Sequence, residues 1–536
     1  MNLVVIIYSL IAGLIFSFGL PPKLFPGLEW VAFIPILGIL LFDLKKKRYY
    51  FYAGFLSGFA TIGKYLFWFF KSAPLTWIGI SSLFWSELLV GLIWFLAIIY
   101  FAFWFGLFIL FIKYFETGKV WDIFLIALSW PIFEFWRTFF YAFYPPIYGD
   151  GNIVGNHMAL GIFGYSLANY YFLRQWSVIG GDYFLSFILV LANALGFYIL
   201  KILINNKNLF FSNYKLFFKK FDLNLVFPLI IFIILILGGN YLIGEYLPSK
   251  TAVSVADIQL NFPVGVWSSF NYPLTVFNKI KTEINQAIII DKPSTNLIVI
   301  PEGADFTQFS GNQLNGIQSL LGVYPYRVII DGSYNEFSSR ENNLAVFDNQ
   351  KGFLGKYAKR FLMPFGEYLP AIINFPVSLV YPNWLYNFSY RWYQPGNKAG
   401  IFSTHFGLIG TLACSEIISP QLSRQEARQG AQIITYAASD SIFRGSSELH
   451  AQNLAMAQIR ATETRRGIVY ASNGEKSFII DSFGNILWEA NSLNFQNGYA
   501  DIPLNSSLTF YDQFGDWFIF FSALVIFLGI MLYRKK

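Results

Sequence analysis

The chain is 536 residues long, and 55% of its residues are apolar, 20% aromatic and 13% charged. A soluble globular protein carries roughly 25% charged residues, so this composition excludes a protein that is soluble throughout. Lysine and arginine outnumber aspartate and glutamate by 38 to 31, a formal net charge of +7 whose meaning depends on where the charges lie. The single cysteine, Cys414, excludes a disulfide framework. Three scattered histidines give no zinc pattern, and we expect neither a metal nor a cofactor.

Apolar, phenylalanine-rich stretches of roughly the 17–25 residues that cross a bilayer recur through the first half of the chain. Seven are predicted before residue 248 and one near the C-terminus: 3–20, 27–44, 49–70, 77–112, 120–143, 183–203, 224–243 and 517–533. The 77–112 stretch is longer than one bilayer crossing. If it formed two spans instead of one, every later segment would lie on the opposite side of the membrane. We expect a membrane domain over 1–247, a soluble domain over 248–512 and a C-terminal membrane helix with a basic tail over 513–536.

Basic residues between the predicted spans indicate orientation, because short cytoplasmic loops retain lysine and arginine. Placing 45–48 inside puts fourteen basic residues on the inner side, among them those of 201–220 and 534–536. The outer short loops hold three: Lys23, Lys71 and Arg174. Residues 248–512 are therefore expected outside the cytoplasm.

The region 248–512 has the short alternating strands, Gly/Pro/Asn turns and charge density of a soluble domain. Strand-like runs lie at 252–256, 297–300, 326–330 and 432–436, and 447–464 has a helical pattern, which together favour layered α/β packing. Residues 249–512 hold 19 basic and 20 acidic side chains. Nucleic acid is not an expected partner, because its phosphates require clustered lysine and arginine.

Three residues in this region suit thiol acyl transfer. Cys414 follows the apolar run 406–413, Glu302 follows the run 297–301, and Lys359 lies in the aromatic, Pro/Gly-stiffened segment 357–368. Taken singly, each has an ordinary structural role: a lone cysteine is commonly buried in a core, a glutamate in a loop is commonly solvated, and a lysine commonly lies on the surface. Taken together they form a sufficient set, because a carboxylate takes the thiol proton and an ammonium stabilises the oxyanion.

The motifs around these residues resemble those of the nitrilase, or carbon–nitrogen hydrolase, superfamily. Pro301-Glu302 is similar to its P-E motif, 357–370 to its Y-x-K-x-x-L-[MV]-P-F-G-E-Y segment, and 414–416 to its C-x-E. Residues 460–474 resemble its R-A-x-E…R…N-[TS]-G pattern. With helices before and after the soluble region, the whole chain resembles the superfamily's membrane-bound branch, the apolipoprotein N-acyltransferases.

The resemblance implies a polytopic α-helical membrane domain and an αββα nitrilase-like sandwich on its outer side. It also implies that Cys414 is the nucleophile, Glu302 the general base and Lys359 the oxyanion stabiliser. Glu367 and Glu416 match supporting carboxylates, which can orient the lysine and keep it charged. The candidates for substrate contact are Trp267, Ile442 and Phe443.

The sequence also departs from the superfamily pattern at two places. Ser415 replaces the aromatic residue that commonly follows the cysteine. The loop 439–445 has Ile442 in place of the tryptophan of N-D-A-W-F-G and adds Arg444. These changes bear on acyl-chain contacts and substrate preference, while the catalytic set is intact.

The implied reaction is a ping-pong transfer at the bacterial cytoplasmic membrane, with the catalytic domain on the periplasmic side and the enzyme a monomer. Cys414 takes an acyl chain from a phospholipid as a thioester, and the N-terminal amine of a diacylglyceryl-cysteine apolipoprotein receives it. Two alternatives stay open: a membrane-tethered amidase with water as acceptor, and a non-enzymatic lipoprotein-binding protein. An amidase acting on small polar substrates gives no reason for eight lipid-facing helices.

Several charged residues fall within the predicted spans, where a charge is expensive, among them Lys64, Glu87, Glu134 and Arg137. For Lys64 and Glu87, a mutual ion pair or snorkelling to the interface competes with binding of a lipid headgroup. Glu134 and Arg137, three residues apart on one helix face, are expected to form a local structural pair.

Overall fold

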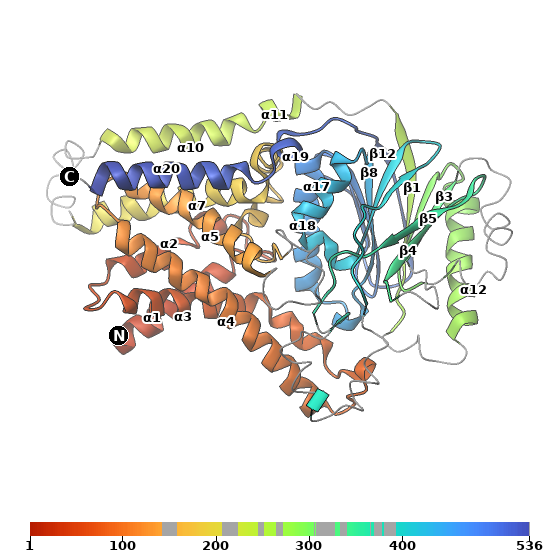
Figure 1. Ribbon diagram of the computed structural model, residues 1–536, viewed down its shortest axis with the longest axis horizontal. Helices are drawn as coiled ribbons and strands as arrows, with labels where there is room; N and C mark the ends of the chain where they lie inside the picture. Colours follow the sequence, from red (N-terminus) through yellow and green to blue (C-terminus); the bar gives the residue numbers. More distant parts are fainter. Residues whose placement is uncertain are drawn as a thin grey trace.

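The computed structural model describes residues 1–141, 158–205, 223–244, 251–263, 272–304, 306, 327–332, 340–364, 366–368, 378–379 and 393–534. Apolar helices form a bundle at one end of the molecule and two β-sheets lie at the other, with both chain termini at the end of the bundle away from the sheets (Figure 1).

Four helical stretches in the described residues are long and apolar enough to cross a membrane. They are α4 (Leu83–Phe115), α5 (Trp121–Tyr141), α7 (Ser177–Asn205) and the stretch formed by α10 (Val226–Gly238) and α11 (Tyr241–Gly244). Shorter helical elements complete the bundle: α1 (Leu3–Ser17), α2 (Ile34–Leu37), α3 (Arg48–Tyr65), α6 (Tyr171–Arg174) and α20 (Trp517–Arg534). Most of the predicted 77–112 stretch lies in one continuous helix, α4, which extends to Phe115. The stretch is therefore not divided into two spans. The polytopic helical prediction is confirmed.

The segment predicted as a span over 27–44 is not one continuous helix. It consists of the 3-10 turn η1 (Leu28–Trp30), the short α2 and the 3-10 turn η2 (Gly38–Leu41). The side chain of Asn193 satisfies the backbone around this interruption, since it accepts from the Phe33 N–H at 3.0 Å and donates to the Glu29 carbonyl at 3.0 Å. Irregular backbone is tolerated at membrane depth where protein groups pair it in this way.

Small residues allow α1 and α3 to approach closely. A Cβ atom at Gly13 would lie 2.0 Å from the Ser57 carbonyl oxygen. The hydroxyls of α3 use this proximity, because Ser57 donates to the Ser9 carbonyl at 2.9 Å and Thr61 to the Gly13 carbonyl at 3.0 Å. Such contacts replace the hydrophobic effect, which does not drive helices together inside lipid.

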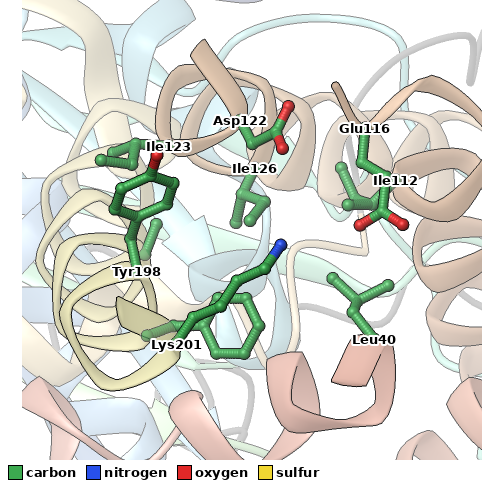
Figure 2. A pocket seen from close by; sticks show the side chains of 10 residues that line it. Leu40, Ile112, Glu116, Asp122, Ile123, Ile126, Tyr198 and Lys201 are labelled. Carbon is green, nitrogen blue, oxygen red and sulfur yellow. The ribbon is translucent and has the colours of Figure 1, made fainter. Parts of the chain in front are cut away.

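A small pocket lies between α4, α5, α7 and η2, away from the sheets. Lys201 extends into it, and its ammonium points toward the space between Glu116 and Asp122 (Figure 2). Asp122 is held by the amides of Thr117 and Gly118, each at 2.7 Å. This pocket is at the opposite end of α7 from the sheets, so it is separate from the site described below.

The C-terminal half of the chain folds into two six-stranded sheets. The first has the order β12-β1-β2-β3-β4-β5 and the second the order β11-β10-β9-β8-β7-β6. The first sheet contains β1 (Ala252–Gln259), β2 (Leu297–Glu302), β3 (Val328–Gly332), β4 (Asn343–Asp348), β5 (Gly352–Ala358) and β12 (Gln496–Pro503). The second contains β6 (Ile401–Ser403), β7 (Leu408–Ala413), β8 (Ile433–Ser439), β9 (Gly467–Asn473), β10 (Phe478–Ile480) and β11 (Ile486–Glu489).

The two sheets pack face to face between helices, in the order α, β, β, α. Helix α12 (Tyr272–Asn285) covers the outer side of the first sheet, while α17 (Pro420–Arg428) and α18 (Ser447–Thr464) lie between the second sheet and the helical bundle (Figure 1). Strands β1–β3 are parallel to one another, as are β7–β9, and most of their residues are buried, as expected for strands covered on both faces. The predicted αββα class is confirmed.

Buried polar contacts join α18 to the helical bundle. Arg460 lies 2.8 Å from the Asp182 carboxylate on α7, and the hydroxyl of Tyr165 donates to the same carboxylate at 2.8 Å. Glu134 and Arg137 do not form the expected ion pair in the described structure. Instead, each binds the backbone of a neighbouring loop, with Glu134 accepting from the Phe163 amide and Arg137 donating to the Leu160 carbonyl.

Candidate active site

Glu302, Lys359 and Cys414 come together although they are distant in sequence. Glu302 is the last residue of β2, Lys359 follows β5 directly, and Cys414 follows β7 directly. The Lys359 Nζ lies 3.6 Å from the Glu302 Oε1, and the Glu302 carboxyl is hydrogen-bonded to the Cys414 side chain. Strand ends hold side chains rigidly at the edge of a sheet, so three chemically different groups meet at a fixed geometry.

The backbone of Cys414 has a left-handed conformation that is rare for a residue with a side chain. Its φ is +40°, and the 3-10 turn η10 (Cys414–Ile418) begins at this residue. Such a conformation costs about 1–2 kcal/mol and persists only where the surroundings enforce it. The sharp turn places Cys414 at the strand end, and the residue as a whole is only partly buried there.

The carboxylate of Glu416 enforces this turn. One oxygen accepts from the Ala413 amide at 2.7 Å, and the other accepts from the amides of Arg360 and Phe361 at 2.7 and 3.0 Å. The hydroxyl of Tyr357 donates to the same carboxylate at 2.8 Å. Glu416 is fully buried, and it ties the backbone beside the thiol to the backbone that directly follows Lys359.

A second carboxylate, Glu367, positions the lysine. Its Oε1 lies 2.9 Å from the Lys359 Nζ and accepts from the Asn342 amide group at 2.8 Å, while its Oε2 accepts from the Met363 N–H at 2.8 Å. Asn342 also donates to the Glu302 Oε1 at 2.5 Å. One amide group therefore fixes both carboxylates that flank the ammonium.

Burial and charge set the protonation states at this site. Burial raises the pKa of the Cys414 thiol well above its ordinary value, against the opposing charge of Lys359. Burial also raises the pKa of Glu302, with Lys359 opposing the change and Glu367 reinforcing it. For Lys359, burial favours the neutral amine, but the carboxylates of Glu302 and Glu367 outweigh it and raise its pKa well above the ordinary value. The resting site thus holds a protonated thiol, a strengthened base and a charged ammonium.

The other predicted residues lie around this centre. Phe443, in the 3-10 turn η11 (Ser441–Phe443), packs edge-on against Trp68 with ring centroids 4.8 Å apart. Ile442 is half-buried in the same turn, and Ser415 donates to the Phe361 carbonyl at 3.3 Å. Trp267 lies outside the described residues. In the part of the chain that is described, no group of three or more His, Cys, Asp and Glu side chains is arranged to hold a metal ion.

Sequence reasoning did not assign roles to several residues that complete the site. Asn342 and Tyr357 hold the carboxylates, and Trp68 reaches the active-site loop from 3-10 turn η3 (Phe67–Ser72) of the helical bundle. Tyr357 falls within the recognised segment, whereas Asn342 and Trp68 carry no local pattern. Arg460 and Glu463, quoted for the superfamily pattern, contact each other and the bundle rather than the thiol.

Two family models match the sequence. The model for the carbon-nitrogen hydrolase family matches residues 275–507, and the model for the apolipoprotein N-acyltransferase N-terminal domain matches residues 12–195. These ranges correspond to most of the two-sheet region and most of the helical bundle.

Curated proteins align with the chain over its whole length or over part of it. The apolipoprotein N-acyltransferase of Geobacter metallireducens is 24% identical, with 98% of this chain and 95% of that one covered. The protein of the same name from Synechocystis sp. is 31% identical over 186 residues, which is 34% of each chain. Among solved structures, the nitrilase-superfamily protein Nit3 of Saccharomyces cerevisiae aligns with a TM-score of 0.37 at 18% identity, covering 48% of this chain and 91% of its own.

Proposed function

We propose that this chain, which belongs to the apolipoprotein N-acyltransferases of the carbon–nitrogen hydrolase superfamily, acylates lipoproteins through a thioester on Cys414. The observation that carries the mechanism is the convergence of a thiol, a buried carboxyl group and a charged ammonium at three strand ends. The sheets that present them are docked on apolar helices, so substrates with acyl chains need not leave the membrane.

In the first half-reaction, Glu302 takes the proton of the Cys414 thiol as the sulfur attacks the ester carbonyl of a phospholipid. The tetrahedral intermediate places negative charge on the former carbonyl oxygen, and the Lys359 ammonium stabilises that charge. When the intermediate collapses, the ester C–O bond breaks and protonated Glu302 returns its proton to the leaving alkoxide. The products are a lysophospholipid and acyl-Cys414.

In the second half-reaction, the N-terminal amine of a diacylated apolipoprotein attacks the thioester carbonyl. Glu302 accepts a proton from the attacking nitrogen, Lys359 again faces the oxyanion, and the C–S bond breaks. The released thiolate recovers the proton from Glu302, which restores the resting site. The lipoprotein leaves with its third acyl chain on an amide.

The arrangement of bundle and sheets gives a physical reason for the membrane domain. Transfer of an acyl chain from lipid to water costs about 0.8 kcal/mol per CH₂, so a long chain must stay in an apolar environment during the reaction. Gly181 of α7 packs against Tyr511, in α19 (Phe510–Phe514) between the sheets and α20, and α18 lies directly on α7. The catalytic domain therefore sits at one end of the helices, where headgroups would lie.

The orientation is inferred from the charge pattern and from where the basic residues lie in the bundle. Lys113 and Lys201 lie near the end of the bundle away from the sheets, as do both termini. Because basic residues favour the cytoplasmic side, we assign that end to the cytoplasm and the sheets to the periplasm of a bacterial cytoplasmic membrane. The domain limits 1–247, 248–512 and 513–536, and a monomeric state, complete the proposal.

The deciding experiment is the intact mass of the purified protein after incubation with phospholipid alone, followed by addition of a diacylated lipopeptide. A gain of one acyl chain on Cys414, then its transfer to the lipopeptide, supports the acyltransferase. Release of free fatty acid with an unmodified lipopeptide would indicate a hydrolase instead, and an unacylated Cys414 would favour a non-enzymatic role. The control is Cys414→Ser, which keeps the size of the side chain but cannot form a thioester.

A further inference from the structure

Three basic side chains gather at the boundary between the bundle and the active-site loop. Lys64 is near the C-terminal end of α3, Lys71 is in η3, and Arg444 directly follows η11. They come from segments almost 400 residues apart, joined by the contact between Trp68 and Phe443. Gln452 of α18 strengthens this junction, accepting from the Trp68 indole N–H at 3.1 Å and donating to the Tyr65 carbonyl at 3.0 Å.

The charges of this basic cluster are not balanced by nearby carboxylates. Glu448, in the first turn of α18, interacts electrostatically with both Lys64 and Lys71. Within the described residues, none of the three cations has a salt-bridge partner, and Glu87 is not paired with Lys64. The three cations therefore outnumber Glu448, the carboxylate that interacts electrostatically with Lys64 and Lys71.

Arg444 has a backbone conformation that suits glycine better than arginine. Its φ is +50° and its ψ is +46°, and its side chain is exposed. A left-handed residue with a Cβ is strained, and strain at a non-glycine residue is commonly kept for a functional reason. The cation is retained at this position although a glycine would fit the turn without strain.

The loop that carries Arg444 begins at a strand end that contacts the catalytic thiol. Arg444 is five residues beyond Ser439, the last residue of β8, and the Ser439 backbone is hydrogen-bonded to the Cys414 side chain. An acyl ester held at the thiol would therefore present its polar headgroup toward this junction. Arginine binds phosphate oxygens through two parallel hydrogen bonds, and lysine adds a point charge.

We propose that Lys64, Lys71 and Arg444 form a binding site for the phosphodiester of the acyl-donor phospholipid, so that this chain selects phospholipids over uncharged acyl esters. The proposal rests on the acyltransferase function and adds a substrate-selecting site to it. The group that this site binds is an anionic phosphate, which a lipid headgroup and free phosphate both carry. We assign it to the headgroup of a membrane lipid. The departure of this sequence at Arg444 thereby acquires a role in donor specificity.

The test compares two acyl donors in identical neutral-detergent micelles: a phosphatidylglycerol and a diacylglycerol with the same acyl chains. The rate of acyl-Cys414 formation gives kcat/KM for each, and the ratio of the two values measures selection for phosphate. We expect the ratio to fall about five- to tenfold in Arg444→Gly, the loss of one charged hydrogen-bonding group, and less in Lys71→Gln. The matched control is Arg428→Gln, which removes an exposed cation at the end of α17.

Arg444→Gly also separates function from folding, because glycine relieves the left-handed strain. Its unfolding temperature should equal or exceed that of the control while its donor ratio falls. Added salt should lower the wild-type ratio more than that of the variant, since Lys71 and Arg444 are exposed and their charges are screened. A ratio unchanged from the Arg428→Gln control, or equal losses with both donors, would overturn the proposal.

Two further results are distinguishable from these. Inorganic phosphate is added at the concentration of lipid that half-saturates the enzyme. If it abolishes the preference for phosphatidylglycerol over diacylglycerol, the site binds free phosphate and the headgroup proposal is wrong. If neither donor acylates Cys414 in the wild type, the acyltransferase mechanism itself fails.

Discussion

Replacement of Glu416 by glutamine tests whether the buried carboxylate holds the nucleophile in place. Both of its oxygens accept from backbone N–H groups, Ala413 on one side and Arg360 and Phe361 on the other. Glutamine has only one acceptor oxygen, so in either orientation of its amide an NH₂ group would face a backbone donor. Glu416→Gln therefore cannot restore the hydrogen bonds by flipping.

The magnitude follows from the bonds that are lost. A hydrogen bond to a charged acceptor contributes about 1.5–3 kcal/mol, and a buried donor left without a partner costs about 1–3 kcal/mol. The variant should lose about 3–5 kcal/mol of stability, or roughly 10 °C in the unfolding temperature of a domain of this size. Relaxation of the left-handed Cys414 backbone should displace the thiol, and a displacement of about 1 Å costs about 100-fold in rate.

The measurements are thermal unfolding, followed by tryptophan fluorescence in detergent, and the rate of acyl-Cys414 formation as a function of pH. A positioning role predicts a slower rate with an unchanged pH profile, because Glu416 exchanges no proton with the substrate. Glu302→Gln is the contrast, since loss of the base should change the profile. The control for stability is Glu489→Gln, at the end of β11. Its unfolding temperature shows the effect of removing a less buried carboxylate. Wild-type stability and rate in Glu416→Gln would refute the reasoning.

Three other predictions concern separate parts of the domain. Asn342→Ala should slow thioester formation about tenfold or more while the thiol stays alkylatable, because the amide that fixes Glu302 and Glu367 is lost; an unchanged rate of acyl-enzyme formation would contradict this. Burial raises the pKa of Asp257 well above its ordinary value. Below the unfolded-state pKa of about 4, Asp257 is protonated in both states and its ionisation costs the folded protein nothing. As the pH rises toward the folded-state pKa, the free energy of unfolding of the wild type declines. Asp257→Asn should consequently raise the unfolding temperature more at pH 8 than at pH 5, and an equal gain at both values would show that ionisation is not the cause. Removal of one partner of the buried Arg460–Asp182 pair should cost about 3–5 kcal/mol in the free energy of unfolding. The double variant, Arg460→Met with Asp182→Asn, should lose less stability than the sum of the two single variants. Additive losses in thermal unfolding would mean that the pair does not couple bundle and sheets.

The amino-acid sequence by itself determined the two-part organisation and the residue types of the candidate site. Apolar runs of bilayer length predict helices from composition alone, because the hydrocarbon core requires that backbone groups be paired within a segment. Alternating strands and a helix at 447–464 predicted layered α/β packing, the resemblance to the superfamily implied the sandwich, and the observed α18 has the predicted bounds. Glu302, Lys359 and Cys414 were recognisable because each lies in or beside a local motif, and a strand end is a local feature of the chain.

Only the tertiary structure decided how these residues are held and what surrounds them. Asn342 bridges two carboxylates from different segments, and Glu416 joins the ends of β5 and β7. The interruption at 27–44 depends on Asn193, which is 160 residues away from Phe33 in the sequence. Such partners leave no periodic or local signal, because hydrogen bonds between distant segments depend on strand register and helix packing.

The basic cluster gives the clearest case of this division. In the sequence, Lys64 is a costly charge in an apolar stretch, Lys71 is an outer-loop cation, and Arg444 is an addition to a loop. The packing of Trp68 on Phe443 brings the segment of Lys64 and Lys71 against the loop of Arg444. Residue types and local periodicity are written along the chain, whereas the proximity that turns separate charges into a binding site arises only when the bundle and the sheets dock.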